Sequence, residues 1–318
     1  MKLYRYSVAG QGRTGCLIGK ELFDFNAYKT FCFSEKGYGQ AAAERLAQQT
    51  TPSDLGDLFA KGPAALKAIK TLAQEVQKLT PQQQQSLRAR GILWDAQKVI
   101  YLPPLGANAT IYCVGRNYQD HVAESGMKPP KVPAMFIRTH HSMVGHRQAL
   151  LKPKASDCFD WEVELAVVIG KECRAVSKKN ALSVVAGYTI LNDGSVRDYQ
   201  FAAPMPTAGK NFFRSGSLGP SITTADEIAD PHDLRVRTLL NRKVMQDDHT
   251  SHMLFNLNAI IAHISEFTPL FPGDIISSGT PSGVGFARKP PKFMFPGDRL
   301  RMEIDHLDPL ENVVEAEG

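Results

Sequence analysis

The run Phe159-Asp160-Trp161-Glu162-Val163-Glu164-Leu165-Ala166-Val167-Val168-Ile169-Gly170 sets two carboxylates in a stretch that otherwise has the composition of a buried β-strand. Side chains alternate along a strand, so Glu162 and Glu164 are expected on one face and the intervening Val163 on the other. No Lys or Arg within the run offsets the two like charges, which repel each other and resist desolvation. A divalent cation would offset them, because hard cations prefer carboxylate oxygen. The alternative is an exposed strand face with solvated glutamates.

Composition limits the class of protein. The chain of 318 residues is long enough for two domains, or for one large domain with an appendage. Its 43% hydrophobic and 22% charged residues are typical of a globular protein. The net charge of +5 is modest, and the basic residues are scattered without interleaved aromatics, so we expect no nucleic-acid partner.

Cysteine usage indicates a reducing compartment. The chain has five cysteines, namely Cys16, Cys32, Cys113, Cys158 and Cys173. They are widely spaced and form no CxxC, which argues against a disulfide framework or a zinc site. The N-terminus lacks the apolar core of a signal peptide, and no apolar run approaches the ~20 residues that span a bilayer. We therefore expect a cytoplasmic protein without a membrane partner.

The first hundred residues differ in character from the rest. Residues 3–8 alternate like a strand, whereas residues 39–90 are rich in Ala, Gln, Leu and Lys, with apolar side chains at helical spacing. Thr51-Pro52 and Thr80-Pro81 are typical helix starts, with Thr as the N-cap. Leu102-Pro103-Pro104-Leu105-Gly106 is typical of a linker. We predict a small N-terminal α/β extension over residues 1–104 and a second domain over residues 105–318.

The second part is dense in strands and turns. Strands are expected at Ile111–Val114, Glu164–Ile169, Thr189–Leu191, Asp274–Ser278 and Leu300–Ile304, and helices at Asn117–Ser125, Lys178–Ala186 and Asn256–Phe267. The strands dominate without a regular βαβ alternation. This pattern favours an α+β fold with a rolled or sandwiched sheet over a doubly wound fold.

Several motifs carry groups suited to chemistry. His121 and Glu124 lie one helical turn apart, and a histidine held by a carboxylate is a suitable general base, although such a pair can also be a plain surface pair. Asp193 follows a strand and could be a third oxygen ligand, or a helix cap. Lys210 stands beside a glycine in an apolar loop and could bind an anion. The glycine-rich turn Ser278–Gly285 could present backbone N–H groups to an anion, but it is not a Walker A loop.

The order of these motifs closely resembles the fumarylacetoacetate hydrolase family over about residues 107–318. The motifs are GRNYxDHxxE at Gly115–Glu124, FDWEVELAVVIG at Phe159–Gly170, NDGSVRDxQ at Asn192–Gln200, GKNF at Gly209–Phe212 and SGTPSGVG at Ser278–Gly285. A segment that ends in Val144-Gly145-His146 is similar to the bacterial branch of 2-oxo acid hydrolases, hydratases and lyases.

This resemblance implies a fold and a cofactor. The catalytic domain would be a rolled mixed β-sandwich, commonly paired as a homodimer, and the longer members carry an N-terminal extension. Glu162, Glu164 and Asp193 would hold a divalent cation, usually Mg²⁺, Mn²⁺ or Ca²⁺.

The resemblance also implies roles for individual side chains. His121 and Glu124 would form a base dyad on a lid helix, and Gln200 would hold the attacking water or polarise the developing oxyanion. Lys210 would neutralise charge at a metal-bound enolate, and Arg197 would support the site. The groups expected to bind substrate are Tyr118, Gly279 and Thr280.

One segment departs from the family pattern. Arg138-Thr139-His140-His141-Ser142 stands where related sequences often have Pro or Phe beside Arg and Ser. Neighbouring side chains of an extended segment point to opposite faces, so at most one of His140 and His141 should face the site. Arg138 has the planar fork suited to a substrate carboxylate, although the segment can also be an ordinary loop.

From the resemblance we expect a metal-dependent hydrolase. It would cleave a carbon–carbon bond in a 2,4-dioxo acid, such as an acylpyruvate or fumarylacetoacetate, through a metal-bound enolate. A lyase, decarboxylase, isomerase or hydratase would use the same enolate and is the nearest alternative. The alternatives from other classes are an inactive protein that binds a metal or ligand, and a structural protein built on the N-terminal helices.

Overall fold

One twelve-stranded sheet runs through most of the chain in the computed structural model, which covers residues 1–318. Ten strands form the path β4-β3-β2-β1-β14-β12-β11-β17-β6-β7, while β5 pairs with β1 and β8 with β14. The strands are β1 (Lys2–Val8), β2 (Gln11–Ile18), β3 (Glu21–Asp24), β4 (Leu93–Asp95), β5 (Ile100–Tyr101), β6 (Ile111–Gly115), β7 (Ala134–Arg138), β8 (Met143–Val144), β11 (Val163–Ile169), β12 (Val185–Asn192), β14 (Gly216–Thr224) and β17 (Ile275–Ser277).

A second sheet of five strands has the order β16-β15-β18-β19-β9, and β10 pairs with β13 in a short ribbon. These strands are β9 (Leu150–Lys152), β10 (Phe159–Asp160), β13 (Ser195–Val196), β15 (Arg235–Leu240), β16 (Lys243–His249), β18 (Arg299–Ile304) and β19 (Leu310–Ala316). Parallel and antiparallel pairs occur in both large sheets. The structure therefore confirms the α+β class with a mixed β-sandwich.

The alternation along β11 separates its two faces as predicted. Val163, Leu165 and Val167 belong to one buried apolar cluster, which also includes residues of β15 and β18 in the five-stranded sheet. Ala166 and Val168 belong to a second apolar cluster on the opposite face. Because Glu164 shares the parity of Ala166, its carboxylate leaves the strand on that opposite face.

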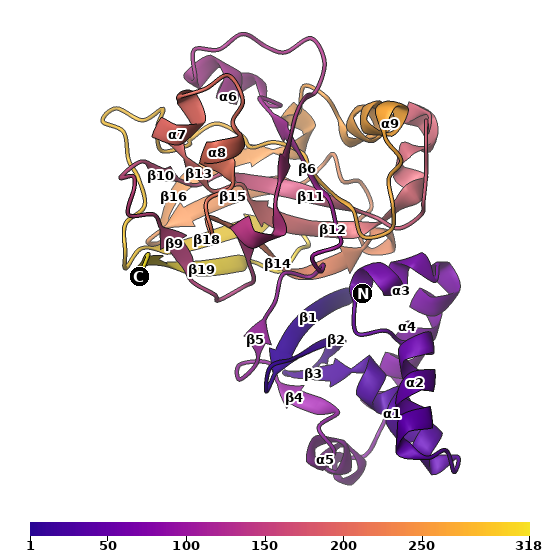
Figure 1. Cartoon of the computed structure of the whole chain (residues 1–318). Helices are drawn as coiled ribbons and strands as arrows, with labels where there is room; N and C mark the ends of the chain where they lie inside the picture. Colours follow the sequence, from indigo (N-terminus) through magenta and orange to yellow (C-terminus); the bar gives the residue numbers. More distant parts are fainter.

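The helices are short and lie at the margins of the sheets. The α-helices are α1 (Phe25–Glu35), α2 (Gln40–Thr50), α3 (Leu55–Ala60), α4 (Pro63–Gln77), α5 (Pro81–Ala89), α6 (Gln119–Glu124), α7 (Arg197–Phe201), α8 (Thr207–Lys210) and α9 (Leu257–Phe267). Figure 1 shows α6, α7 and α8 together at the top of the molecule, above the strands of the larger part. None of the helices combines the length and the apolar character that spanning a membrane requires.

Local signals predicted some helix ends and missed others. Thr80 caps α5 in a capping box with Gln83, as its Thr-Pro pair predicts. The same signal at Thr51 is wrong, because Thr51 ends α2 and Asp54 caps the next helix instead. The helix expected over Lys178–Ala186 is a 3-10 helix that ends at Val184, where β12 takes over.

The N-terminal extension continues the sheet of the larger part. Leu3 of β1 pairs with Ile222 of β14, so the sheet crosses the predicted boundary at residues 104 and 105. Phe23 and Leu58 share one apolar cluster with Cys113 of β6. Figure 1 shows β1–β5 and α1–α5 below the larger part, with β1 leading up toward β14. The division at that boundary remains a prediction, and the shared core indicates that the two parts stabilise each other.

Candidate metal and catalytic site

Three buried carboxylates converge on the face of β11 that carries Glu164. Glu162 directly precedes β11 and Asp193 directly follows β12, the neighbouring strand in the sheet. The Asp193 N–H donates to the Glu162 carbonyl oxygen at 2.8 Å, which holds the two residues together. One oxygen from each of Glu162, Glu164 and Asp193 lies within 4.8 Å of the others. The same-face arrangement predicted from the alternation is therefore present, and the alternative of solvated glutamates is excluded.

Basic side chains form ion pairs with two of these carboxylates, Glu162 and Asp193. Lys210, at the end of α8, places Nζ 2.6 Å from Glu162 Oε2 and 2.6 Å from Asp193 Oδ2. Arg197 Nη1 lies 2.7 Å from Glu162 Oε1, and Arg138 Nη1 lies 2.6 Å from Asp193 Oδ1. Burial alone would lower the pKa of Lys210, but Asp193 and Glu162 raise it above its ordinary value. Lys210 therefore carries a proton in this site.

Glu164 has no cationic partner. Its Oε2 accepts hydrogen bonds only from the Ser277 hydroxyl at 2.6 Å and the Gly279 N–H at 2.9 Å. Burial, with Asp193 and Glu162 nearby, raises its pKa well above the ordinary value. Burial would also raise the pKa of Glu162, but Lys210 and Arg197 outweigh it and hold that pKa far below the ordinary value.

The balance of buried charge fits a divalent cation. Four carboxylates and three basic side chains meet here. All seven side chains are buried: Asp160, Glu162, Glu164, Asp193, Arg138, Arg197 and Lys210. An ionised Glu164 would leave one negative charge without a basic partner. A buried unpaired charge is costly, whereas an oxygen-ligated divalent cation would reverse the net charge to positive. Glu162, Glu164 and Asp193 are therefore suited to hold such a cation, and the reversed charge would then favour an anionic ligand.

A cavity of about 410 Å³ opens over the carboxylates. His121, on α6, lines it and places Nδ1 2.8 Å from Glu124 Oε1. The second oxygen of Glu124 accepts the Gly283 N–H at 2.8 Å. Gly283 has φ 99°, and a Cβ there would lie 2.2 Å from a backbone oxygen, so only glycine fits this turn. The glycine-rich turn thus fixes Glu124, which in turn orients the His121 ring.

The family model described as Fumarylacetoacetate (FAA) hydrolase C-terminal matches residues 110–315. The chain belongs to the fumarylacetoacetate hydrolase family. A relative from Rattus norvegicus, the mitochondrial oxaloacetate tautomerase Fahd2a, is 36% identical over 259 residues, which cover 81% of this chain and 83% of the relative.

Solved structures of the same family share the fold. The 2-hydroxyhepta-2,4-diene-1,7-dioate isomerase of Mycobacterium marinum is similar with a TM-score of 0.70 and 26% identity, covering 100% of this chain and 99% of that one. The maleylpyruvate hydrolase of Sphingobium sp. SYK-6, in complex with manganese(II) and pyruvate, gives a TM-score of 0.73 and 26% identity, with 100% of both chains covered. The family therefore includes isomerases, tautomerases and hydrolases.

Other residues taken from the family pattern lie at or behind the cavity. Gln200 lines it, and its Oε1 accepts a hydrogen bond from Arg197 Nη1 at 2.8 Å. Thr280 also lines it, although its hydroxyl donates to the Val163 carbonyl oxygen. Gly279 does not line the cavity, because its N–H is directed at Glu164. Its position in the structure supports a role in holding Glu164 rather than a substrate carboxylate.

Two residues expected to contact substrate, Arg138 and Tyr118, lie outside the cavity lining. The Arg138 guanidinium is buried behind the site, where it donates to Asp193, to the Gly194 carbonyl oxygen and to the hydroxyls of Ser142 and Ser215. These hydrogen bonds use Nε, Nη1 and Nη2 of the guanidinium, so Arg138 positions Asp193 and does not reach the cavity.

Tyr118 is also buried away from the cavity, and its hydroxyl makes no hydrogen bond. The histidine doublet likewise stays outside the cavity lining. His140 and His141 form part of a short 3-10 helix, and the His141 side chain is exposed. Neither histidine reaches the site in this structure.

Two functional side chains were missed by the sequence reasoning. Asp160 accepts from Arg197 Nε at 2.8 Å and from the N–H groups of Gly285 and Phe286, so it fixes the arginine that holds Glu162. Arg116 lines the cavity and makes no ion pair or hydrogen bond through its side chain. Its φ of 58° is uncommon for a residue other than glycine. Both residues stand inside the family motifs, which was the available signal.

Proposed function

We propose that this protein moves a proton at the carbon next to the oxo group of a 2-oxo acid, with a divalent cation as cofactor. The observation that carries the proposal is that His121, held by Glu124, lines the same cavity as the carboxylate cluster. Glu124 occupies Nδ1, so Nε2 of His121 is left without a partner in the protein. That nitrogen is free to accept a proton from a bound ligand.

Some residues of the site would stabilise negative charge on the substrate, and His121 would transfer the proton. A cation held by Glu162, Glu164 and Asp193 would supply Lewis-acid stabilisation of negative charge on the substrate oxygens. His121 removes the proton from carbon, and the electron pair moves to the 2-oxo oxygen. Lys210, on the same wall, attracts that negative charge. Return of a proton to the oxygen completes the conversion from the keto to the enol form.

Tautomerisation of a four-carbon oxo acid is the reaction that we place first. The rat relative is an oxaloacetate tautomerase and aligns along most of this chain. Arg116 supports a substrate with a second carboxylate, because its unpaired guanidinium lines the same cavity as the carboxylate cluster. An oxo dicarboxylate would place one carboxylate near the cation and the other toward Arg116.

Hydrolysis of a carbon–carbon bond in a 2,4-dioxo acid is the second candidate. Apolar side chains form part of the cavity wall, namely Met127, Met135, Phe136, Phe201, Met205 and Phe286. This wall would accept a longer acyl group than oxaloacetate carries. His121 would then take a proton from water as it attacks the 4-carbonyl. The bond between carbons 3 and 4 would break with its electron pair on carbon 3, and return of the proton to carbon 3 would give two acids.

A substrate panel tests both candidates. Purified protein with Mg²⁺ or Mn²⁺ should speed the enol-to-keto conversion of oxaloacetate, measured by the loss of enol absorbance, and EDTA should abolish the effect. The panel should also contain acylpyruvates and maleylpyruvate, scored for release of pyruvate. Acceleration that survives EDTA would contradict the role of the cation, and hydrolysis without tautomerisation would reverse the order of the candidates.

A further inference from the structure

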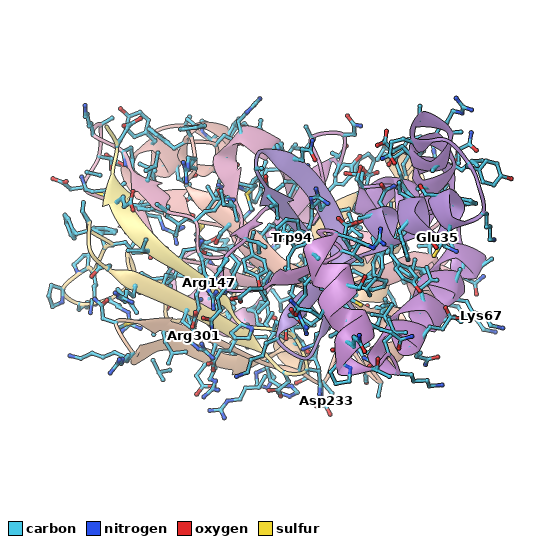
Figure 2. All side chains as sticks on the ribbon, turned by 90° about the horizontal axis from the view of Figure 1, so that it is seen from below. Glu35, Lys67, Trp94, Arg147, Asp233 and Arg301 are labelled. Atoms are coloured by element: carbon cyan, nitrogen blue, oxygen red, sulfur yellow. The ribbon has the colours of Figure 1, made fainter.

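A hollow beside the five-stranded sheet is lined by several arginines. It has a volume of about 560 Å³, and its lining includes Arg147, Arg242, Arg299, Arg301 and Glu311. Figure 2, which views the molecule from below, shows Arg147 and Arg301 close together beside these strands. None of the five residues lines the cavity over the carboxylates.

Three of these arginines have no partner. Arg301 pairs with Glu303 and Glu311, but Arg147, Arg242 and Arg299 form no ion pair and no side-chain hydrogen bond. Several other arginines of the chain are tied to a carboxylate: Arg13 to Asp24, Arg88 to Glu21 and Arg237 to Glu303. Glu311 is the only carboxylate in the lining, so positive charge in the hollow is in clear excess.

The backbone holds these arginines in place. Asn241 and Arg242 form the two-residue turn between β15 and β16, with φ of 51° and 67°. Glycine is usual at the second position of such a turn, so an arginine there is conformationally costly. The Asn241 N–H donates to the Arg299 carbonyl oxygen at 2.9 Å, and the Arg299 N–H donates to Asn241 Oδ1 at 2.9 Å. Arg242 and Arg299 are therefore fixed next to each other despite their like charges.

Arg147 approaches from a third element. It has φ of 61°, and its N–H donates to the Glu311 carbonyl oxygen at 2.7 Å. Its guanidinium lies 5.9 Å from the centre of the Tyr101 ring. Arginines at two left-handed positions thus face one hollow, although a glycine or asparagine would suit each backbone better.

We propose that this hollow is a second ligand site, which binds a compact anion with at least two negative charges. Guanidinium forks pair with phosphoryl and carboxylate oxygens through two parallel hydrogen bonds, so either group fits the chemistry. The excess positive charge favours an anion over a cationic ligand. This site is independent of the reaction proposed above.

Isothermal titration calorimetry without added divalent cation tests the proposal, with pyrophosphate as the phosphoryl probe and citrate as the carboxylate probe. Arg242→Gly with Arg299→Ser should weaken binding of the preferred probe ~10-fold, because two charged contacts are lost. Arg242→Gly also relieves the left-handed turn, so the variant should melt no lower than the wild type. Turnover of oxaloacetate should not change.

The matched control is Arg45→Ser with Arg90→Ser, which removes the same charge from two other arginines without ion pairs. It should change affinity less than twofold. Equal weakening by both double variants would reduce the effect to net charge and overturn the site. Binding that is absent, or that the Arg242→Gly and Arg299→Ser variant leaves unchanged, would also overturn it, as would a change from a multimer to a monomer in that variant without a change in anion affinity.

Discussion

The chain builds two networks of acidic and basic side chains that differ in their access to water. In the buried cluster, Arg138, Arg197 and Lys210 contact Asp160, Glu162 and Asp193, and no side chain is more than 5% exposed. On the outer face of the five-stranded sheet, Arg237 and Arg301 contact Glu303 and Glu311, with side chains 23–42% exposed.

The difference shows that an unpaired charge indicates a bound ion only where the charge is buried. Water screens the outer network, so an extra charge there costs little. The side chains of the buried cluster are largely shielded from water, so an unpaired charge there is costly. The buried carboxylate of Glu164, which has no basic partner, therefore points to a metal cation, whereas the two arginines and two glutamates of the outer network balance each other.

The largest effect is expected from breaking a buried pair. Arg138→Met removes one of the two basic partners of Asp193 and leaves only Lys210 beside this buried carboxylate, so unfolding should become easier by about 3–5 kcal/mol. Urea denaturation of the cation-free protein measures this change. A loss below about 1 kcal/mol would show that water reaches Asp193.

The proton-transfer step should respond separately from stability. His121→Gln keeps a polar group at the dyad but removes the base, so turnover should fall ~100-fold while cation affinity stays the same. Steady-state rates and Mn²⁺ titration measure the two quantities. Tyr118→Phe is the control, because its buried hydroxyl has no partner and its loss should leave the rate unchanged. Near-normal rates in His121→Gln would remove His121 from the mechanism.

The smallest effect belongs to the outer network. Arg237→Met removes one of the two arginines that contact Glu303, as Arg138→Met removes one of the two basic partners of Asp193, but it should change the unfolding free energy by about 0–1 kcal/mol. High salt should reduce the effect further. A loss as large as that of Arg138→Met would mean that burial does not separate the two networks.

The sequence predicted what depends on local periodicity and on motif order. Alternation placed Glu162 and Glu164 on one face, and motif order joined them to Asp193, His121 and Lys210. The contacts of Arg138 could not be predicted, because its partners lie directly before β14 and in the turn after β12, two segments that strand pairing brings together.

The geometry of the turns could not be predicted from the sequence either. Gly279 was expected to present its N–H to substrate, but its φ of 96° accompanies an N–H that is directed at Glu164. The sequence also gave no sign that Leu3, near the N-terminus, would pair with Ile222 in the second domain. Such contacts join distant segments, and no short window of sequence contains them.

Binding of Mn²⁺ tests the central claim most directly. Equilibrium titration followed by electron paramagnetic resonance counts the bound ions in the wild type and in Glu164→Gln, which removes the spare charge but keeps the shape of the side chain. The wild type should bind one Mn²⁺ per chain, and Glu164→Gln should bind none in the same range while its cation-free form melts no lower. A wild type that binds no Mn²⁺, or a Glu164→Gln variant that binds it equally well, would contradict a cation site at this cluster.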